Sequence, residues 1–252
     1  MRAHAGYFAA CPSWSGNGIL IDTYLITSEH GGNRIPAPYR RLFRGRQHLL
    51  QTHFGYDPGS LVMARALAAA LNAPLVSSTV SRLLIDINRP PGHPQLYSVI
   101  TRDTPAPLRA EIAAQHHHPY WAQVERLVRQ AVSRGRRVIH ISSHSFTPAL
   151  NGEVRQADIG LLYDPARRGE AVLCDRWKSA LAEIAPTLRV RRNYPYLGTA
   201  AGLTAQLRLR FPPRAYVGIE LEVNQRITLA AGRRWTALRA TLIQSLRAAC
   251  AA

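Results

Sequence analysis

Cysteine, lysine and acidic residues are scarce in this chain of 252 residues. The three cysteines, Cys11, Cys174 and Cys250, are odd in number, and none stands in a Cys-x-x-Cys pair. This pattern argues against a disulfide framework and against a cysteine-ligated zinc site. Any metal ion would therefore need histidine and carboxylate ligands.

Long apolar runs are also absent. No stretch reaches the roughly 18 consecutive apolar residues that a membrane-spanning helix needs. The N-terminal segment has only a short apolar stretch, broken by Cys11 and Pro12, which is unlike a secretory signal. We therefore expect a cytoplasmic protein without a membrane partner.

The shortage of acidic residues leaves a strong positive charge. Lys and Arg number 32 against 15 Asp and Glu, a formal net charge of +17. Such a balance can indicate a polyanionic partner. However, Lys178 is the only lysine, and arginine is scattered over nearly every segment rather than concentrated. We interpret the charge as a solvated basic surface and expect no specific nucleic-acid partner.

The residues that are present predict one globular α/β domain spanning 1–252. Hydrophobic residues make up 46% of the chain and charged residues 19%. Strand-like and helix-like segments alternate, which favours a largely parallel sheet with helices on both faces. Strands are expected at 18–28, 75–78, 83–87, 138–142, 159–163 and 217–223, and helices at 58–72, 107–133 (kinked near Pro119), 168–184 and 234–249.

Polar clusters follow several of these strands. They lie at 28–33, 86–89 and 143–146, and a last one at 220–224 holds Glu220, Glu222 and an asparagine. In open α/β sheets, ligands bind beyond the carboxyl ends of the strands. We therefore expect these clusters to face one cleft.

The residue types in these clusters suit a mononuclear zinc hydrolase. Catalytic zinc takes about three His or carboxylate ligands and leaves a position for water. A nearby carboxylate can then move the water proton, while arginine or asparagine stabilises an oxyanion or clamps a substrate carboxylate. His30 and His144 are the candidate ligands, although either one alone could be a hydrogen-bonded structural group.

Other histidines and the glutamate pair leave alternatives open. His140 is interpreted as a structural histidine on its strand. The run 116–118 holds three consecutive histidines, which on a helix point in different directions. Glu220 and Glu222 lie two residues apart on a strand and so share one face, which means that spacing does not decide which is catalytic.

Seven segments, in their order and spacing, resemble a known family over roughly residues 20 to 228. They are 28–36, 53–59, 81–90, 144–148, 155–160, 193–196 and 218–226. The chain is similar to the N-formylglutamate amidohydrolases, particularly an uncharacterised branch. These belong to a wider group of zinc hydrolases with metallocarboxypeptidases and zinc-dependent N-acetylmuramoyl-L-alanine amidases.

The resemblance implies a three-layer α/β/α sandwich of the phosphorylase/hydrolase-like type, with a mixed, mostly parallel sheet and one zinc ion. It implies that His30 is the first ligand and His144 the last. Carboxypeptidases place a glutamate three residues after the first histidine, where this chain has Asn33. The muramoyl amidases use a carboxylate at the start of the next helix, here Asp57. We predict Asp57, because a carboxylate balances the metal charge better than a neutral amide.

The same resemblance assigns substrate-binding residues. The segment 86–89 is similar to the Asp-x-Asn-Arg segment with which carboxypeptidases hold a substrate carboxylate. It implies that Asn88 and Arg89 anchor an acidic substrate, with Arg155 as a further substrate-binding residue. Arg82 is expected to serve the oxyanion.

The expected catalytic carboxylate is Glu222, with Glu220 in reserve. The predicted function is metal-dependent cleavage of a linear amide in a small acidic N-acyl amino acid such as N-formylglutamate. A peptidase or muramoyl-amide hydrolase of the same fold is the enzymatic alternative. Asn33, and Ala201 where relatives often have an acidic residue, keep open a metal-free binding or regulatory homologue. The sequence leaves the oligomeric state open.

Overall fold

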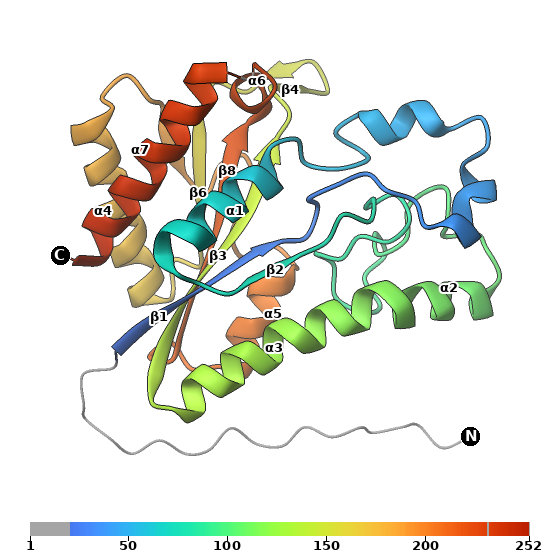
Figure 1. Ribbon diagram of the computed structural model, residues 1–252, viewed down its shortest axis with the longest axis horizontal. Helices are drawn as coiled ribbons and strands as arrows, with labels where there is room; N and C mark the ends of the chain where they lie inside the picture. The colour runs from blue at the N-terminus through green and yellow to red at the C-terminus, as the bar shows by residue number, and fades with distance from the viewer. Residues whose placement is uncertain (1–20, 231, 252) are drawn as a thin grey trace.

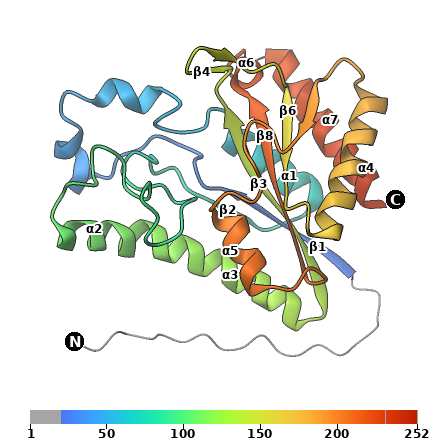
Figure 2. The ribbon, with the colours of Figure 1, turned by 180° about the vertical axis from the view of Figure 1, so that it is seen from behind.

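The sheet at the centre of the fold has six strands in the order β2-β1-β3-β8-β6-β7. The computed structural model describes residues 21–230 and 232–251, and Figures 1 and 2 show it from opposite sides. Strand β6 runs antiparallel to β8, and every other neighbouring pair is parallel. The strands are β1 (Ile21–Ser28), β2 (Leu75–Ser77), β3 (Arg136–Phe146), β6 (Ile159–Leu162), β7 (Val190–Arg192) and β8 (Tyr216–Asn224), with a separate hairpin of β4 (Ala149–Leu150) and β5 (Glu153–Val154).

Helices cover both faces of this sheet. One apolar cluster joins it to α1, α4 and α7, and a second joins it to α3, α5 and the loops between β1 and α2. The helices are α1 (Ser60–Leu71), α2 (Ala106–Ile112), α3 (His118–Ser133), α4 (Arg168–Ile184), α5 (Leu203–Arg210), α6 (Gln225–Thr228) and α7 (Gly232–Ala251), with short turns of helix η1 (Ala37–Phe43), η2 (Gln47–Gln51) and η3 (Ala113–His117). The predicted α/β fold with a mixed, mostly parallel sheet is confirmed. None of the helices in the described ranges has the length and apolar character to cross a membrane.

The two faces of the central strand β8 differ in polarity. All nine residues of β8 are buried. Ile219 and Leu221 pack into the cluster beneath α4 and α7. Because side chains alternate along a strand, Glu220 and Glu222 point to the opposite face. The sheet thus buries carboxylates at the carboxyl end of a core strand.

Strand β3 is longer than the sequence pattern suggests. The prediction ended it at 142, but β3 continues to Phe146 because it stays in register with β8 as far as the pair Phe146 and Asn224. His144 therefore lies within the strand, opposite Glu222, rather than in a loop after it. Pairing between distant segments, which a local pattern does not encode, extends the strand.

The segment 83–87 is a second correction, since it is not a strand. It is a buried succession of turns in which Leu84 N–H donates to Ser81 O and Asp86 N–H donates to Leu96 O. The apolar side chains of this segment contribute to the core cluster that contains α3. The segment is apolar because it is buried in the core, although it does not pair as a strand. Hydrophobicity alone therefore predicted a strand that is not present.

The long helix predicted over 107–133 is present, but it is divided into two helices before Pro119. Between α2 and α3 the chain forms the π-helical turn η3, which ends two residues before Pro119. Proline has no backbone N–H to donate, so a widened turn before it is a physically reasonable accommodation. The remaining predicted helices are present within a few residues of their expected bounds, and residues 18–20 of the first predicted strand lie outside the described ranges.

A glycine fixes where α1 begins. Gly59 has a φ of +84°, and a Cβ at this position would lie 2.5 Å from Cβ of Thr228. Only glycine suits both the left-handed backbone and the close approach. The tight turn before α1 places Asp57 at the carboxyl edge of the sheet, where its N–H donates to the backbone oxygen of His30.

A buried ion pair connects α4 to α5 and the sheet, and it gives a test of the fold. Glu170 is fully buried, with its carboxylate 3.0 Å from Nε of Arg208. Glu170→Ala should lower the free energy of unfolding by about 3–5 kcal/mol, because the buried guanidinium loses its partner. Chemical denaturation measures this change.

The matched control is Asp175→Ala on the same helix. Asp175 forms an exposed ion pair with Arg192, and exposed pairs contribute at most about 1 kcal/mol. Equal destabilisation by the two substitutions would contradict a specific role for the buried pair.

Candidate active site

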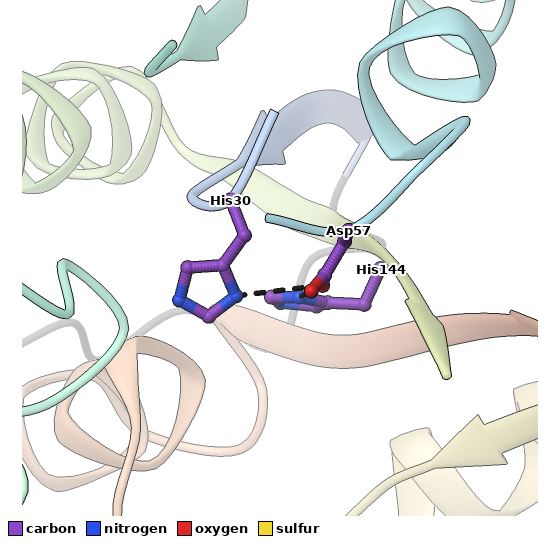
Figure 3. Close-up of side chains that lie close together, drawn as sticks. All are labelled: His30, Asp57 and His144. Carbon is purple, nitrogen blue, oxygen red and sulfur yellow. Dashed lines mark hydrogen bonds and ion pairs between the residues drawn. The ribbon is translucent and has the colours of Figure 1, made fainter. Parts of the chain in front are cut away.

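Three polar side chains from distant segments meet at the carboxyl edge of the sheet. His30 follows β1, Asp57 precedes α1, and His144 lies near the end of β3. One potential ligand atom from each lies within 4.8 Å of the others, and all three residues are buried. Figure 3 shows the side chains of His30, Asp57 and His144 close together, with the carboxylate of Asp57 near both imidazoles. The site lies at the switch point of the sheet, where the chain continues to β2 on one side of β1 while β3 lies on the other.

Both histidines are oriented by a carboxylate behind the ring. Nε2 of His30 lies 2.7 Å from Oδ1 of Asp86, and Nε2 of His144 lies 3.1 Å from Oε2 of Glu29. Each Nε2–H therefore donates to its carboxylate partner. Each Nδ1 faces Asp57, at 3.4 Å for His30 and 2.9 Å for His144. Metal-binding histidines are commonly held by such carboxylate partners.

Glu29 is fully buried within a polar network. Its carboxylate accepts hydrogen bonds from the hydroxyls of Tyr120 and Ser142. Burial opposes ionisation, but the hydrogen bond and charge of His144 hold the pKa of Glu29 well below its usual value. Glu29 is therefore an anion that fixes the ring of His144.

Asp57 is likewise held ionised. Burial opposes this, but the two histidines lower the pKa of Asp57 well below its usual value. The three groups form a His–Asp–His donor set of the kind that catalytic zinc uses. Nδ1 of His30 is buried and has no hydrogen-bond partner among the described residues. This unpaired nitrogen beside an ionised carboxylate and a second imidazole fits a divalent metal ion.

Asn33 does not join the cluster. Its amide nitrogen donates to the backbone oxygen of Leu50 and the side chain of Gln51. The structure thus brings Asp57, and not Asn33, to the two histidines.

Glu220 and Glu222 share a face but differ in their surroundings. Glu220 accepts a hydrogen bond from the hydroxyl of Thr204. Oε2 of Glu222 is buried without a partner among the described residues. Burial raises the pKa of Glu222 to about 8. Of the two, Glu222 is the carboxylate that has an unpaired oxygen and a pKa raised towards the neutral range, as a proton-transfer group needs.

These groups open onto one cavity of about 210 Å³. Its lining includes the three clustered residues, both glutamates, Arg82, Asn88, Arg89, His53 and Tyr196. The opposite wall is formed by the segment 196–202. Two arginines therefore face the same space as the His–Asp–His cluster.

The arginines and Asn88 of this wall are themselves held in place. Arg82 lies 2.7 Å from Asp86 and 3.5 Å from Asp57. Arg89 donates to the backbone oxygen of Ala201 through Nη1, while its Nε makes no hydrogen bond to the described residues. Oδ1 of Asn88 accepts the N–H of Leu203 at the start of α5.

Comparison with known proteins identifies the family of the chain. The sequence model of the N-formylglutamate amidohydrolases matches residues 23–229. The chain belongs to the N-formylglutamate amidohydrolase family. No curated relative matches it.

Two solved structures share its fold. The gene product Atu2144 of Agrobacterium tumefaciens is 29% identical, with a TM-score of 0.78 over 90% of each chain. An N-formylglutamate amidohydrolase of Ralstonia eutropha JMP134 is 20% identical, with a TM-score of 0.66 over 93% of this chain and 95% of that one. At 20% identity the second likeness concerns the fold alone.

Asn88 and Arg89, two of the predicted substrate-binding residues, line the cavity, whereas Arg155 lies elsewhere. It is buried, and its guanidinium lies 5.0 Å from the ring centre of Tyr196 and 5.9 Å from that of Phe146. It is not among the described residues that line the cavity. Arg155 therefore supports the aromatic wall from behind.

Two of the remaining histidines have structural roles in this amidohydrolase-family fold. Both ring nitrogens of His140 are bonded, to Thr27 and to Tyr216, and burial lowers the pKa of His140 to about 4. His117 donates to the backbone oxygen of Arg89. The structural interpretation of His140 is confirmed.

Sequence reasoning missed Glu29 and His53 as site residues. Glu29 stands directly before His30, and a carboxylate beside a candidate ligand was the available signal. His53 falls inside the segment 53–59 that supports the family resemblance, but nothing in its spacing shows that its ring lines the cavity.

The raised pKa of Glu222 predicts how stability depends on pH in the metal-free protein. Its folded-state pKa of about 8 exceeds the usual carboxyl value, so the folded state binds more protons between roughly pH 5 and 8. Its contribution to stability is present at low pH and is lost as pH rises through this window. Glu222→Gln removes the ionisation and should gain stability over wild type with rising pH, by up to about 4 kcal/mol.

Denaturation at pH 5, 7 and 9 in the presence of a chelator measures this difference. Glu183→Gln, at an exposed glutamate of α4, should follow wild type at every pH. A Glu222→Gln difference that is the same at all three pH values would contradict the prediction.

Proposed function

We propose that this protein is a metal-dependent amidohydrolase that cleaves the linear amide of a small N-acyl amino acid such as N-formylglutamate. The observation that carries the proposal is the His–Asp–His cluster beside Glu222, a buried carboxylate without a partner, in one cavity. Family membership supports hydrolysis of this kind of bond.

His30, Asp57 and His144 would hold one zinc ion. When bound, the ion supplies Lewis-acid activation of water and of the acyl carbonyl. The protein's own contribution is to fix the two imidazoles through Asp86 and Glu29, so that little rearrangement is needed on binding.

Glu222 is the proposed proton-transfer group. Its free Oε2 accepts a proton from the attacking water and later delivers it to the leaving amine nitrogen. A carboxyl whose pKa lies near neutrality can perform both transfers. Glu220, bonded to Thr204, instead holds the neighbouring helix against the strand.

The arginines of the cavity suit an acidic substrate. Nε of Arg89 lies 3.8 Å from Asp86 but makes no hydrogen bond to the described residues, and Asn88 lines the same cavity, so we assign the substrate carboxylate to Asn88 and Arg89. Arg82 lies beside Asp57 and is assigned to the oxygen on which negative charge develops. A cavity of about 210 Å³ suits one amino-acid derivative better than a peptide or muropeptide.

Metal content tests the ligand assignment. Purified under zinc-replete conditions, wild type should contain about one zinc per chain by elemental analysis. His144→Ala and Asp57→Ala should lose it, because each removes a ligand from a buried set of three. Asn33→Ala is the matched control and should retain zinc. Wild type without zinc, or Asn33→Ala without it, would contradict this assignment.

Kinetics test the choice of base. On an N-acyl amino acid that wild type cleaves, Glu222→Gln should lower kcat by at least about 100-fold while zinc content is unchanged. Glu220→Gln should lower it much less, because Glu220 already accepts a hydrogen bond from Thr204. The reverse order of effects would assign the base to Glu220.

A further inference from the structure

Four buried polar atoms that belong to residues lining the same cavity have no hydrogen-bond partner among the described residues. They are Nδ1 of His30, Nε2 of His53, Nε of Arg89 and Oε2 of Glu222. An unsatisfied buried polar atom costs about 1–3 kcal/mol, so several of them around one cavity indicate a ligand that satisfies them. The proposed function uses three of the four and leaves His53 without a role.

His53 projects from a turn that the surrounding structure holds firmly. Gly55 N–H donates to Thr52 O at 2.9 Å, and Gly55 O accepts the hydroxyl of Ser81 at 2.8 Å. A Cβ on Gly55 would lie 2.3 Å from Leu50 O, so the turn has no room to adjust there. The ring of His53 also lies 4.1 Å from that of Phe54. The backbone that carries the imidazole is thus held in place before any ligand arrives.

Burial and the nearby positive charges favour the neutral form of His53. Burial, followed by the positive charges of Arg82 and Arg155, lowers the pKa of His53, and Asp57 only partly opposes this. Arg82 lies 3.5 Å from Asp57, the aspartate of the His–Asp–His cluster, and both residues line the cavity together with His53. A neutral imidazole is a poor anchor for a carboxylate, but it can donate one N–H to an oxygen.

We propose that His53 is a further catalytic residue, which donates a hydrogen bond from Nε2 to the acyl oxygen of the substrate. The inference rests on the proposed function. As water adds, a C–O bond forms, the carbonyl electron pair moves onto the acyl oxygen, and the water proton passes to Glu222. The C–N bond then breaks and the nitrogen takes that proton. His53 keeps its own proton throughout and stabilises the negative oxygen together with Arg82.

The test compares wild type, His53→Ala and His53→Gln on one N-acyl amino acid. Loss of a hydrogen-bond donor to a developing oxyanion typically lowers kcat by about 100-fold. We expect His53→Ala to show a loss of this size with KM and zinc content unchanged, and His53→Gln to recover at least part of it through its amide N–H. His48→Ala, at an exposed histidine of η2 in the same stretch of chain, should match wild type.

Three results would overturn the inference: an unchanged kcat in His53→Ala, a loss expressed mainly as a raised KM, or a loss of zinc. The second would make His53 an anchor for the substrate, and the third would make it a structural support of the metal cluster. Circular dichroism and thermal unfolding check that each variant is folded.

A second measurement separates this inference from the proposed function. Zinc-loaded wild type is mixed with acetohydroxamate, which mimics the acyl group, and the histidine ring nitrogens are followed by NMR. A shift of the His53 Nε2 signal supports the contact even if no N-acyl amino acid tested is cleaved. An unshifted His53 signal overturns it. Failure of wild type to bind zinc or cleave any substrate would instead count against the proposed function.

Discussion

The site depends on two buried carboxylate–histidine pairs, Asp86 with His30 and Glu29 with His144. Each carboxylate takes the outer N–H of an imidazole and so decides which nitrogen faces Asp57. Without these anions the rings could rotate or change tautomer, and the donor set would lose its shape. The pairs are themselves secured, Asp86 by Arg82 and Glu29 by the hydroxyls of Tyr120 and Ser142.

The sheet makes this concentration of charge possible. Strands β1, β3 and β8 are adjacent and parallel, so their carboxyl ends deliver polar groups to one edge, while the face that packs against α1, α4 and α7 remains apolar. The anions and cations at this edge largely compensate one another, which lowers the cost of burying them. A small set of buried atoms in residues around one cavity has no hydrogen-bond partner among the described residues. These atoms indicate where metal and substrate would bind.

Much of this arrangement could be predicted from the chain, and the exceptions have physical causes. The spacing of apolar residues and the positions of turn-forming residues located the main helices and most strands. The segment 83–87 was misassigned because burial by loops and burial by sheet pairing produce the same apolar pattern. Strand β3 was cut short because its last residues are strand only by pairing with β8. Arg155 was expected near substrate, but its guanidinium lies behind the rings of Phe146 and Tyr196, a packing relation that residue type does not reveal.

The sequence by itself determined the fold class, the family and the residues that could carry chemistry, because residue types and their order along the chain are local properties. It placed His30, Asp57, His144 and Glu222 in a candidate set, preferring Asp57 to Asn33 and Glu222 to Glu220, but residue spacing alone did not exclude Asn33 or Glu220. The tertiary structure separated these pairs. Asn33 hydrogen-bonds to an adjoining loop and Glu220 to Thr204, whereas Asp57 lies near both imidazoles and Oε2 of Glu222 has no partner among the described residues. Hydrogen-bond satisfaction and burial depend on neighbours from distant parts of the chain, and only folding brings these together.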